Sequence, residues 1–414
     1  MPADSSPPPS SSTRALTPAL AALAIALLLG LQPVTTDLYL PALPLLTREL
    51  QAGMPAAQLT MSLVLLGFGV AQLLLGPLSD RLGRRPVLLG GLALHALASL
   101  GAALAPSIEA LVLARTLQGI GLAASVVCAR AMVRDLYEPQ QGAHVMAWAM
   151  SGLGVLALAS PLLGGWLTTT LGWRAPLGAV AAVAGATLAF TAWRVPETIP
   201  HRDPAALRPG PLLQRLLAVL RHPGFRAWAA LVSATYGGLF LMLAGSSFVY
   251  IGLLGLSPVA YGFALGAASL SYLAATFYCR RLLARRGLAG AVRLGAAFTL
   301  AGGLGMAGLA LAGSTSVAGV IAAHLLYNFG HGIHQPCGQT GAVGAFPRSA
   351  GLASAVAGFL LALTAFAVGL WLGAALDGSL RPLGLGLGFF ALATAAIAWT
   401  SVQRHGERFE PVPT

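Results

Sequence analysis

Long apolar segments separated by short polar breaks repeat along this whole 414-residue chain. A helix needs about 20 apolar residues to cross the hydrocarbon core of a bilayer. Segments of that length occur at twelve places, and we predict a transmembrane helix at each. They cover residues 16–46, 57–79, 86–106, 109–131, 142–168, 173–193, 226–248, 257–279, 289–311, 316–344, 350–374 and 382–400.

The longest polar break, residues 194–225, divides these segments into six plus six. We therefore expect an all-α membrane protein with two pseudo-symmetric six-helix bundles, residues 15–193 and 226–401, joined by a cytoplasmic loop. Such paired halves suggest alternating access around a site near the midplane. Residues 1–14 are rich in Pro and Ser and are predicted to be a disordered tail. Residues 402–414 are predicted to be a cytoplasmic tail.

Composition supports lipid as the surrounding solvent. The chain is 57% hydrophobic and only 9% charged, whereas soluble proteins carry about 25% charged residues. The net charge of +12 would suggest a nucleic-acid partner in a soluble protein. Here the positive charge lies in the breaks between apolar segments, so orientation in a membrane explains it better, and no nucleic-acid partner is expected.

The arginines give the expected orientation, and all 24 basic residues are Arg. If the N-terminus is cytoplasmic, 20 of them fall on the cytoplasmic side of the twelve segments. Only Arg48, Arg174 and Arg381 fall outside, and Arg115 lies within a segment. This bias is what the positive-inside rule predicts for a protein with both termini in the cytoplasm.

Asp37 is the only charged residue between positions 15 and 46. An ionisable group at membrane depth is costly, usually faces a bundle interior or a wet cavity, and indicates a functional site. Desolvation disfavours the charged form of a carboxyl group, so a carboxyl there can take up and release a proton. The alternative is that Asp37 only caps the outer end of its helix, among nearby prolines.

The break after the second segment carries the most specific motif. It reads Gly76-Pro-Leu-Ser-Asp80-Arg81-Leu-Gly83-Arg84-Arg85-Pro86. This spacing resembles the loop signature G-x-x-x-D-R-x-G-R-R/K of the major facilitator superfamily. A basic turn that only follows the positive-inside rule would explain the arginines but not the spacing of Gly and Asp.

The resemblance implies that this loop is a conformational switch. Gly76 is expected to allow two helices to approach closely, and Asp80 to pair with Arg84. Asp135, at the inner end of the fourth segment, is expected to join them in a charge cluster that locks one conformational state.

Further stretches, covering residues 30 to 375, resemble the Bcr/CflA group of drug:proton antiporters. They begin at Thr36-Asp37-Leu-Tyr39, Arg115-Thr-Leu-Gln118-Gly119, Ser160-Pro161-Leu-Leu-Gly164-Gly165 and Ala350-Gly351-Leu-Ala353. Ser160 stands where the antiporter motif of Pro161, Gly164 and Gly165 usually has a preceding glycine. The resemblance implies that Arg115 couples protonation of Asp37 to substrate movement. The alternative is a structural Arg115 that binds carbonyls of a neighbouring helix.

The tenth segment carries a stripe of polar residues. On a helix its members fall within an arc of about 80°; they are His324, Asn328, His331, Gln335 and Gln339. We predict that Asn328, His331 and Gln335 form a substrate-binding wall. Hydrogen bonding between helices is the main alternative, and a metal site is a weaker one because no Asp, Glu or Cys joins this face.

Aromatic residues offer a second part of a binding site. Tyr236 and Phe240 lie one turn apart in the seventh segment and, with Tyr39 and Gln118, are expected to contact substrate. The alternative is that the aromatic side chains pack between helices or face lipid, since periodicity does not identify the cavity face.

We therefore expect a proton-coupled exporter of small, largely apolar, drug-like molecules in the bacterial inner membrane. We expect a monomer that catalyses no reaction. The proton would be the coupling ion, and no metal or other cofactor is expected. One rival is a protein of the same fold that moves a specific metabolite related to sugars, nucleosides or amino acids. A second rival, a membrane enzyme or sensor, predicts a buried nucleophile or paired carboxylates, which the segments lack.

Overall fold

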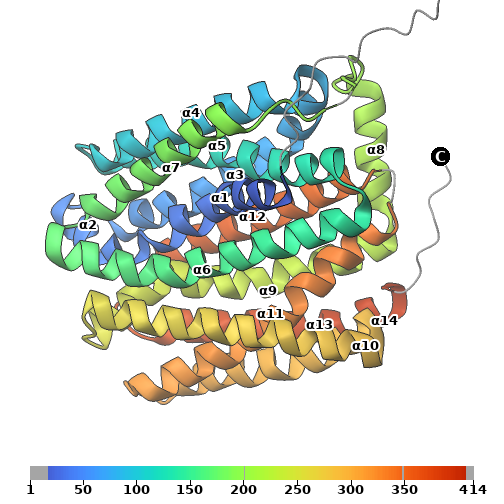
Figure 1. Cartoon of the computed structure of the whole chain (residues 1–414). Coiled ribbons are helices and arrows are strands. Elements are labelled where there is room, and N and C mark those ends of the chain that lie inside the picture. The colour runs from blue at the N-terminus through green and yellow to red at the C-terminus, as the bar shows by residue number, and fades with distance from the viewer. Residues whose placement is uncertain (1–16, 200, 347–348, 407–414) are drawn as a thin grey trace, which may run out of the picture.

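The computed structural model describes residues 17–199, 201–346 and 349–406. The predicted tail 1–14 and most of the predicted tail 402–414 lie outside these residues. The described residues form helices and connecting turns without a strand (Figure 1). The elements are α1 (Pro18–Asp37), η1 (Leu40–Ala42), α2 (Leu43–Glu49), α3 (Met54–Leu82), α4 (Arg84–Ala103), α5 (Ile108–Leu136), α6 (Pro139–Leu171), α7 (Arg174–Arg194), α8 (Pro209–Arg221), α9 (Pro223–Ser247), η2 (Phe248–Leu253), α10 (Pro258–Leu311), α11 (Val317–Gly344), α12 (Ala350–Ala375), α13 (Arg381–Trp399) and α14 (Ser401–His405).

Ten helical stretches of the described chain are long and apolar enough to cross a membrane. The predicted segments 257–279 and 289–311 both fall within the 54-residue α10. Gly287 inside α10 has φ 65° and ψ −174°, a backbone conformation that glycine adopts without the steric cost of a Cβ atom. Two helices therefore meet at Gly287. The predicted segment 316–344 is the 28-residue α11, which is not among the ten.

Helix starts follow from local sequence. The side chains of Ser107, Ser257 and Ser316 accept backbone N–H groups at the N-termini of α5, α10 and α11, which satisfies donors that lack a partner within the helix. Proline occupies the first turn of several other helices, including α3 and α9, where its missing N–H costs nothing.

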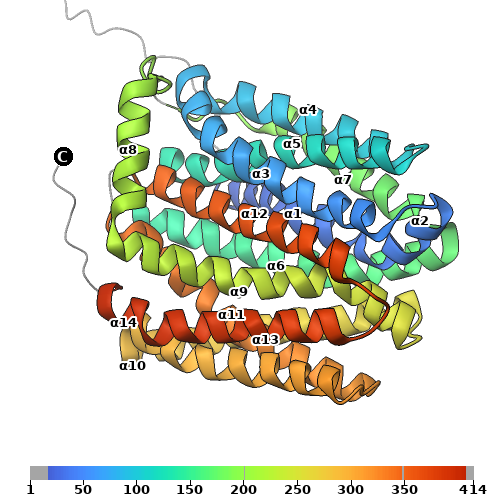
Figure 2. The same ribbon diagram turned by 180° about the vertical axis from the view of Figure 1, so that it is seen from behind.

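Two helix pairs join the first part of the chain to the second. α3 packs along α12, and α6 packs along α10 (Figures 1 and 2). In the first part, α5 packs against α3 and α4, while α1 packs against α6. In the second part, α9 packs against α11, α12 and α13, and α10 packs against α11 and α13.

The two ends of the molecule differ. At the end that carries α2, one apolar cluster includes Leu40 and Leu46 of the first part together with Phe240 and Tyr250 of the second. At the end that carries α8, a cross-contact is polar: Arg130 of α5 donates to Ser354 of α12 at 3.2 Å. The two parts are therefore held together by buried apolar packing at the α2 end.

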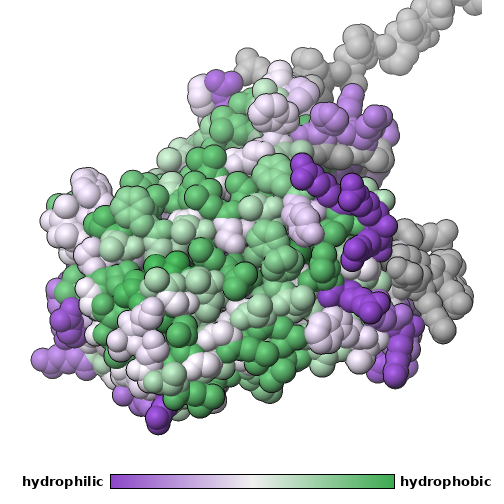
Figure 3. Space-filling model, turned by 90° about the horizontal axis from the view of Figure 1, so that it is seen from below, coloured by the Kyte–Doolittle hydropathy of each residue, from purple (hydrophilic) through white to green (hydrophobic). Residues whose placement is uncertain are grey.

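The surface matches a bilayer environment. Figure 3 shows hydrophobic side chains across the middle of the molecule and hydrophilic patches towards its ends. Large apolar side chains are exposed on several helices, among them Leu97, Trp148 and Phe389. Contiguous exposed apolar surface of this kind requires lipid or a partner to cover it.

Candidate functional site

Asp37 is the last residue of α1, and its side chain is partly exposed. The Thr36 hydroxyl donates to Asp37 Oδ1 at 2.7 Å. No ion pair to Asp37 exists among the described residues. The carboxyl group is thus not neutralised by a cation among the described residues.

The second part of the chain supplies aromatic neighbours to Asp37. Tyr236 of α9 and Tyr261 of α10 lie within electrostatic range of the Asp37 carboxyl group. The Tyr261 hydroxyl is 2.8 Å from the Ser246 hydroxyl, and the Tyr261 ring packs against Tyr250 at 5.8 Å between centroids. Leu38, next to Asp37, packs against Gly164 of α6, and the adjacent Gly165 packs against Pro258 of α10, so Asp37 lies close to where the two parts of the chain meet.

Arg115 of α5 is fully buried and bound mainly to backbone carbonyls. Its Nη1 donates to Thr35 O at 3.0 Å, and its Nε donates to Thr60 O at 3.2 Å. Its guanidinium lies 4.5 Å from the centre of the Tyr39 ring, a cation–π contact. A buried cation without a carboxylate needs such partners, so this arrangement matches the structural alternative raised for Arg115.

A wider polar network surrounds Arg115. Gln118 Oε1 accepts from Arg115 Nη1 at 2.9 Å, and Gln118 Nε2 donates to Ser99 Oγ at 2.7 Å. His95 Nδ1 donates to Gln118 O at 3.0 Å, and its Nε2 lies 3.2 Å from Thr35 Oγ1. The Tyr39 hydroxyl is 2.6 Å from Thr60 Oγ1. Gln118 and Tyr39, both predicted to bind substrate, lie fully buried inside this network.

Asp37 and Arg115 form no hydrogen bond or ion pair with each other among the described residues, although two adjacent residues of α1 contact one group each. Thr35 accepts from Arg115 through its carbonyl, and Thr36 donates to Asp37 through its hydroxyl. A rotation or bend of α1 at these two residues would alter both contacts together. The two groups are thus joined through adjacent residues of α1 and not by a direct ion pair.

His331 of α11 lies in an aromatic surrounding. Its Nδ1 is 3.1 Å from the Thr235 hydroxyl. Its ring lies 6.4 Å from the Tyr236 ring and 5.8 Å from the Tyr272 ring. His331 thus shares Tyr236 with Asp37, which links the predicted α11 wall to the Asp37 surroundings.

The other residues of the α11 stripe divide into two kinds. Asn328 Oδ1 and Gln335 Oε1 are buried oxygen atoms without a hydrogen-bond partner among the described residues. His324, in contrast, lies 3.3 Å from the Tyr250 hydroxyl. The described residues include no group of three His, Cys, Asp or Glu side chains that could hold a metal ion. Phe240, predicted to bind substrate, is fully buried in the apolar cluster at the α2 end.

A cluster of charges lies where α3 meets α4 and α5. Arg84 forms ion pairs with Asp80 and, at 2.9 Å, with Asp135 of α5. Its Nη1 also donates to Ser79 Oγ at 2.7 Å. Gly83 has φ 109°, which favours glycine and turns the chain sharply between α3 and α4. The three charged residues are thus joined within the first part of the chain.

The remaining residues of the loop motif play different parts. Arg85 Nε donates to Val195 O at 2.9 Å, whereas Arg81 is exposed. A side-chain carbon placed on Gly76 would lie 4.0 Å from Val127, an ordinary van der Waals distance.

Glu197 is a member of this cluster that the sequence reasoning missed. Its carboxylate accepts the backbone N–H of Arg84 at 2.9 Å and of Arg85 at 3.3 Å. An acidic side chain at a helix N-terminus also stabilises the helix dipole. Thr198, the next residue, donates to Asp135 at 3.4 Å. The only sequence signal was an acidic residue within an arginine-rich break.

The motif of Pro161, Gly164 and Gly165 lies where α6 meets two other helices. A Cβ atom on Gly164 would clash with the backbone of Leu38, next to Asp37, and one on Gly165 would clash with the backbone of Pro258 in α10. Glycine is therefore required at both positions for this packing. The motif brings the Asp37 region and the second part of the chain against the same face of α6.

Known proteins are similar to this chain in sequence. The profile of the Major Facilitator Superfamily matches residues 25–369. A chloramphenicol resistance protein of Pseudomonas aeruginosa is 32% identical over 77% of this chain and 75% of its own length. Multidrug resistance protein D of Escherichia coli (strain K12) is 34% identical over 57% of this chain and 59% of its own length. A bicyclomycin resistance protein homolog of Haemophilus influenzae is 26% identical over 68% of this chain and 71% of its own length.

Solved structures share the architecture. A D-xylose-proton symporter superposes with a TM-score of 0.72 at 17% identity and covers 94% of this chain and 98% of its own. A bacterial homolog of the human lysosomal transporter Spinster, inward-facing and occupied, superposes with a TM-score of 0.70 at 14% identity, covering 96% of this chain and 99% of its own. At these identities the likeness shows the fold alone.

Proposed function

Because this chain belongs to the major facilitator superfamily, a family of transporters, we propose that it exports small, largely apolar, drug-like molecules in exchange for protons. The resemblance first drawn from the loop between Gly76 and Pro86 is confirmed. The protein is a multi-pass protein of the bacterial inner membrane, with relatives named for multidrug, chloramphenicol and bicyclomycin resistance.

We propose twelve spans in two six-helix halves. Ten helical stretches are apolar and long enough to cross a membrane, and two observations on α10 and α11 support two further spans. α10 contains 54 residues and changes direction at Gly287, so it is long enough for two crossings at 1.5 Å per residue. α11 contains 28 residues, and its polar residues face other helices. In this arrangement both termini and α8 lie in the cytoplasm, as the distribution of arginines favours.

The observation that carries the proposal is the position of Asp37 between the two halves. It is the one acidic residue of α1, it is partly exposed, and its neighbour Leu38 packs on α6 at Gly164, beside the contact of Gly165 with α10. When the α2 end opens, a proton from outside binds a carboxylate oxygen of Asp37. The neutral carboxyl group then no longer attracts a polar or cationic part of the substrate, which leaves to the outside.

Return of the proton completes the cycle. In the state described here, apolar packing closes the α2 end, and we propose that Asp37 releases its proton towards the α8 end. We propose that Arg115 holds α1 in place through Thr35, so that a change at Asp37 moves α1 as a unit. The cluster of Arg84, Asp80 and Asp135 stabilises one of the two states at the α8 end.

We propose that substrate binds between Asp37 and α11. Tyr236 and Tyr272 offer aromatic faces around His331, and the unpartnered oxygens of Asn328 and Gln335 can accept hydrogen bonds from a substrate. Few directional groups among many apolar ones suit a site that accepts several compounds. No cofactor is required beyond the proton, and a single chain contains every group of the proposed site.

Transport by purified protein in liposomes tests this proposal. An imposed pH gradient should drive accumulation of chloramphenicol or an apolar dye by the wild type, and Asp37→Asn should show none. The rival assignment to a specific metabolite predicts that a sugar, nucleoside or amino acid is moved instead. Accumulation of such a metabolite alone, with no drug transported, would overturn the proposed substrate class.

A further inference from the structure

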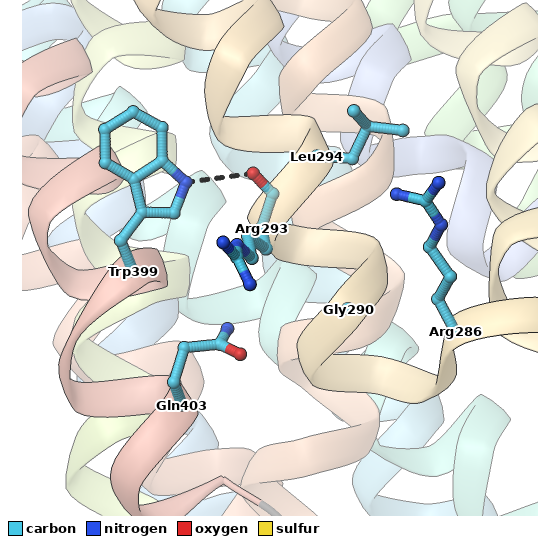
Figure 4. Close-up of a pocket in the computed structure, with 6 residues that line it drawn as sticks. All are labelled: Arg286, Gly290, Arg293, Leu294, Trp399 and Gln403. Atoms are coloured by element: carbon cyan, nitrogen blue, oxygen red, sulfur yellow. Dashed lines mark hydrogen bonds between the residues drawn. The ribbon is translucent and has the colours of Figure 1, made fainter.

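A cavity of about 1060 Å³ lies between α10 and the helices α13 and α14, far from the site described above. Figure 4 shows Arg293 of α10 beside Trp399 and Gln403, and Arg286 further along α10, beyond Gly290. The cavity is lined by Arg286, Gly290, Arg293, Leu294, Trp399 and Gln403. It follows the turn at Gly287 and opens at the end of the molecule that carries α14.

Two hydrogen bonds between helices build the wall of this cavity. Trp399 Nε1 donates to Arg293 O at 2.9 Å (Figure 4). Gln403 Nε2 donates to Ala289 O at 3.0 Å. Both bonds join side chains of the last helices to carbonyls of α10, so they fix the spacing of the two walls and keep the cavity open.

Among the residues that the structure describes, the positive charge in the cavity has no acidic counterpart. The sequence contains no Asp or Glu between positions 204 and 376. Arg286 and Arg293 form no ion pair among the described residues. Guanidinium groups bind phosphate oxygens through paired N–H donors. Two such groups facing one cavity therefore favour an anion, and in particular a phosphate group.

The surface that continues from the cavity is apolar. On α10 the exposed positions after Arg293 recur at helical spacing and include Leu304, which is 48% exposed. On α13 the exposed positions before Trp399 also recur at helical spacing. They include Phe389 and Leu392, which are 64% and 54% exposed. Because α10 and α13 pack side by side, these positions form an apolar track that ends at the two arginines.

We propose that this cavity binds the headgroup of an anionic phospholipid, with its phosphodiester on Arg286 and Arg293 and its acyl chains along the apolar track. Trp399 lies between the charged end and the apolar track, the position that tryptophan favours at a membrane interface. Basic pockets between transmembrane helices bind anionic headgroups in this way. A free phosphate ion would use the arginines but not the track, so the track favours a lipid.

Native mass spectrometry of the full chain in detergent tests the proposal. The protein is titrated with phosphatidylglycerol and, separately, with phosphatidylcholine of the same acyl chains. The wild type should bind phosphatidylglycerol at least tenfold more tightly. Arg286→Gln/Arg293→Gln should lose at least fivefold in affinity for phosphatidylglycerol and little for phosphatidylcholine. The matched control Arg281→Gln/Arg285→Gln removes the same charge from exposed positions of α10 outside the cavity and should stay within twofold.

Three outcomes would overturn the proposal. Equal losses of affinity for phosphatidylglycerol in both double variants would show that lipid binding depends only on the overall charge of the protein. Complete displacement of the lipid by millimolar inorganic phosphate or glycerol phosphate would show a site for soluble anions. The third outcome concerns Trp399→Phe, which keeps both arginines. Phosphatidylglycerol with brominated acyl chains should quench the tryptophan fluorescence of the wild type more than that of Trp399→Phe. Equal quenching of the two proteins would place the lipid elsewhere.

Discussion

The two halves of this transporter carry their charge in different ways. Residues 15–203 contain eight acidic residues, whereas residues 204–406 contain only Asp377. Both ion pairs among the described residues, those of Arg84 with Asp80 and Asp135, lie in the first half. The second half presents histidine, tyrosine and amide side chains inside and unpaired arginines at its edge.

This difference suggests a division of labour. The first half contains the groups that can change or respond to charge: Asp37, Arg115 and the Arg84 cluster. In the proposed mechanism the second half contributes aromatic and amide groups around His331 that contact the substrate. Asp37, at the junction of the halves, then makes substrate release depend on a proton.

The largest effect is expected at Asp37. Asp37→Asn keeps the size and the hydrogen bond from Thr36 but cannot bind and release a proton. Transport driven by a pH gradient should fall at least a hundredfold, while exchange of substrate across the membrane without a gradient should stay within about tenfold. The two rates are measured in the same liposomes. Asp37→Glu, which keeps the titratable group, should recover part of the driven transport. Driven transport by Asp37→Asn at the wild-type rate would contradict the coupling role.

Arg115 tests whether the first half is held together by its buried cation. Arg115→Ala removes the hydrogen bonds to the carbonyls of Thr35 and Thr60 and leaves the buried Gln118 Oε1 without its donor, which alone costs about 1–3 kcal/mol. We expect a clear drop in thermal stability in detergent together with lost transport. Arg115→Lys keeps the charge but reaches fewer acceptors and should be intermediate in stability. If Arg115→Ala were as stable as the wild type yet inactive, the residue would act in coupling alone.

The Arg84 cluster should affect turnover more than binding. Asp135→Asn removes the ion pair with Arg84 far from the proposed substrate site, so we expect turnover to fall about five- to tenfold with substrate affinity within twofold. Glu109→Gln is the matched control, because it removes an exposed acid from the other end of the same helix. Substrate binding titrations and initial rates give the two quantities. Weaker binding at unchanged turnover would exclude a role in the conformational equilibrium.

The smallest effect is expected in the second half. His331→Gln can keep the hydrogen bond to Thr235 that orients this side chain, whereas His331→Leu cannot. We expect roughly fivefold weaker substrate binding by His331→Leu than by His331→Gln, the equivalent of about 1 kcal/mol. Cysteine at Gln335, a partly exposed position, should react with a small water-soluble thiol reagent and be protected by substrate. Cysteine at Leu326, which is 40% exposed on another face, should not. Labelling at Leu326 but not at Gln335 would remove α11 from the site.

The sequence by itself was sufficient for the class, the family and most helices. A bilayer requires about 20 apolar residues for each crossing, and these residues are consecutive in the chain. The loop motif around Asp80 was readable for the same reason, since its residues lie within one short stretch. Asp37 could be selected because a single charge in an apolar segment is visible without any knowledge of its neighbours.

Only the tertiary structure decided which groups meet. Arg115 binds carbonyls of residues 55 and 80 positions away, and Glu197 binds the start of α4 across 113 positions. Tyr236 lies near Asp37 although the two belong to different halves. Backbone carbonyls are present at every residue, so no pattern in the sequence marks the ones that accept a buried cation. Hydrophobic periodicity assigns residues to helices, but helix packing selects the partner of each polar side chain.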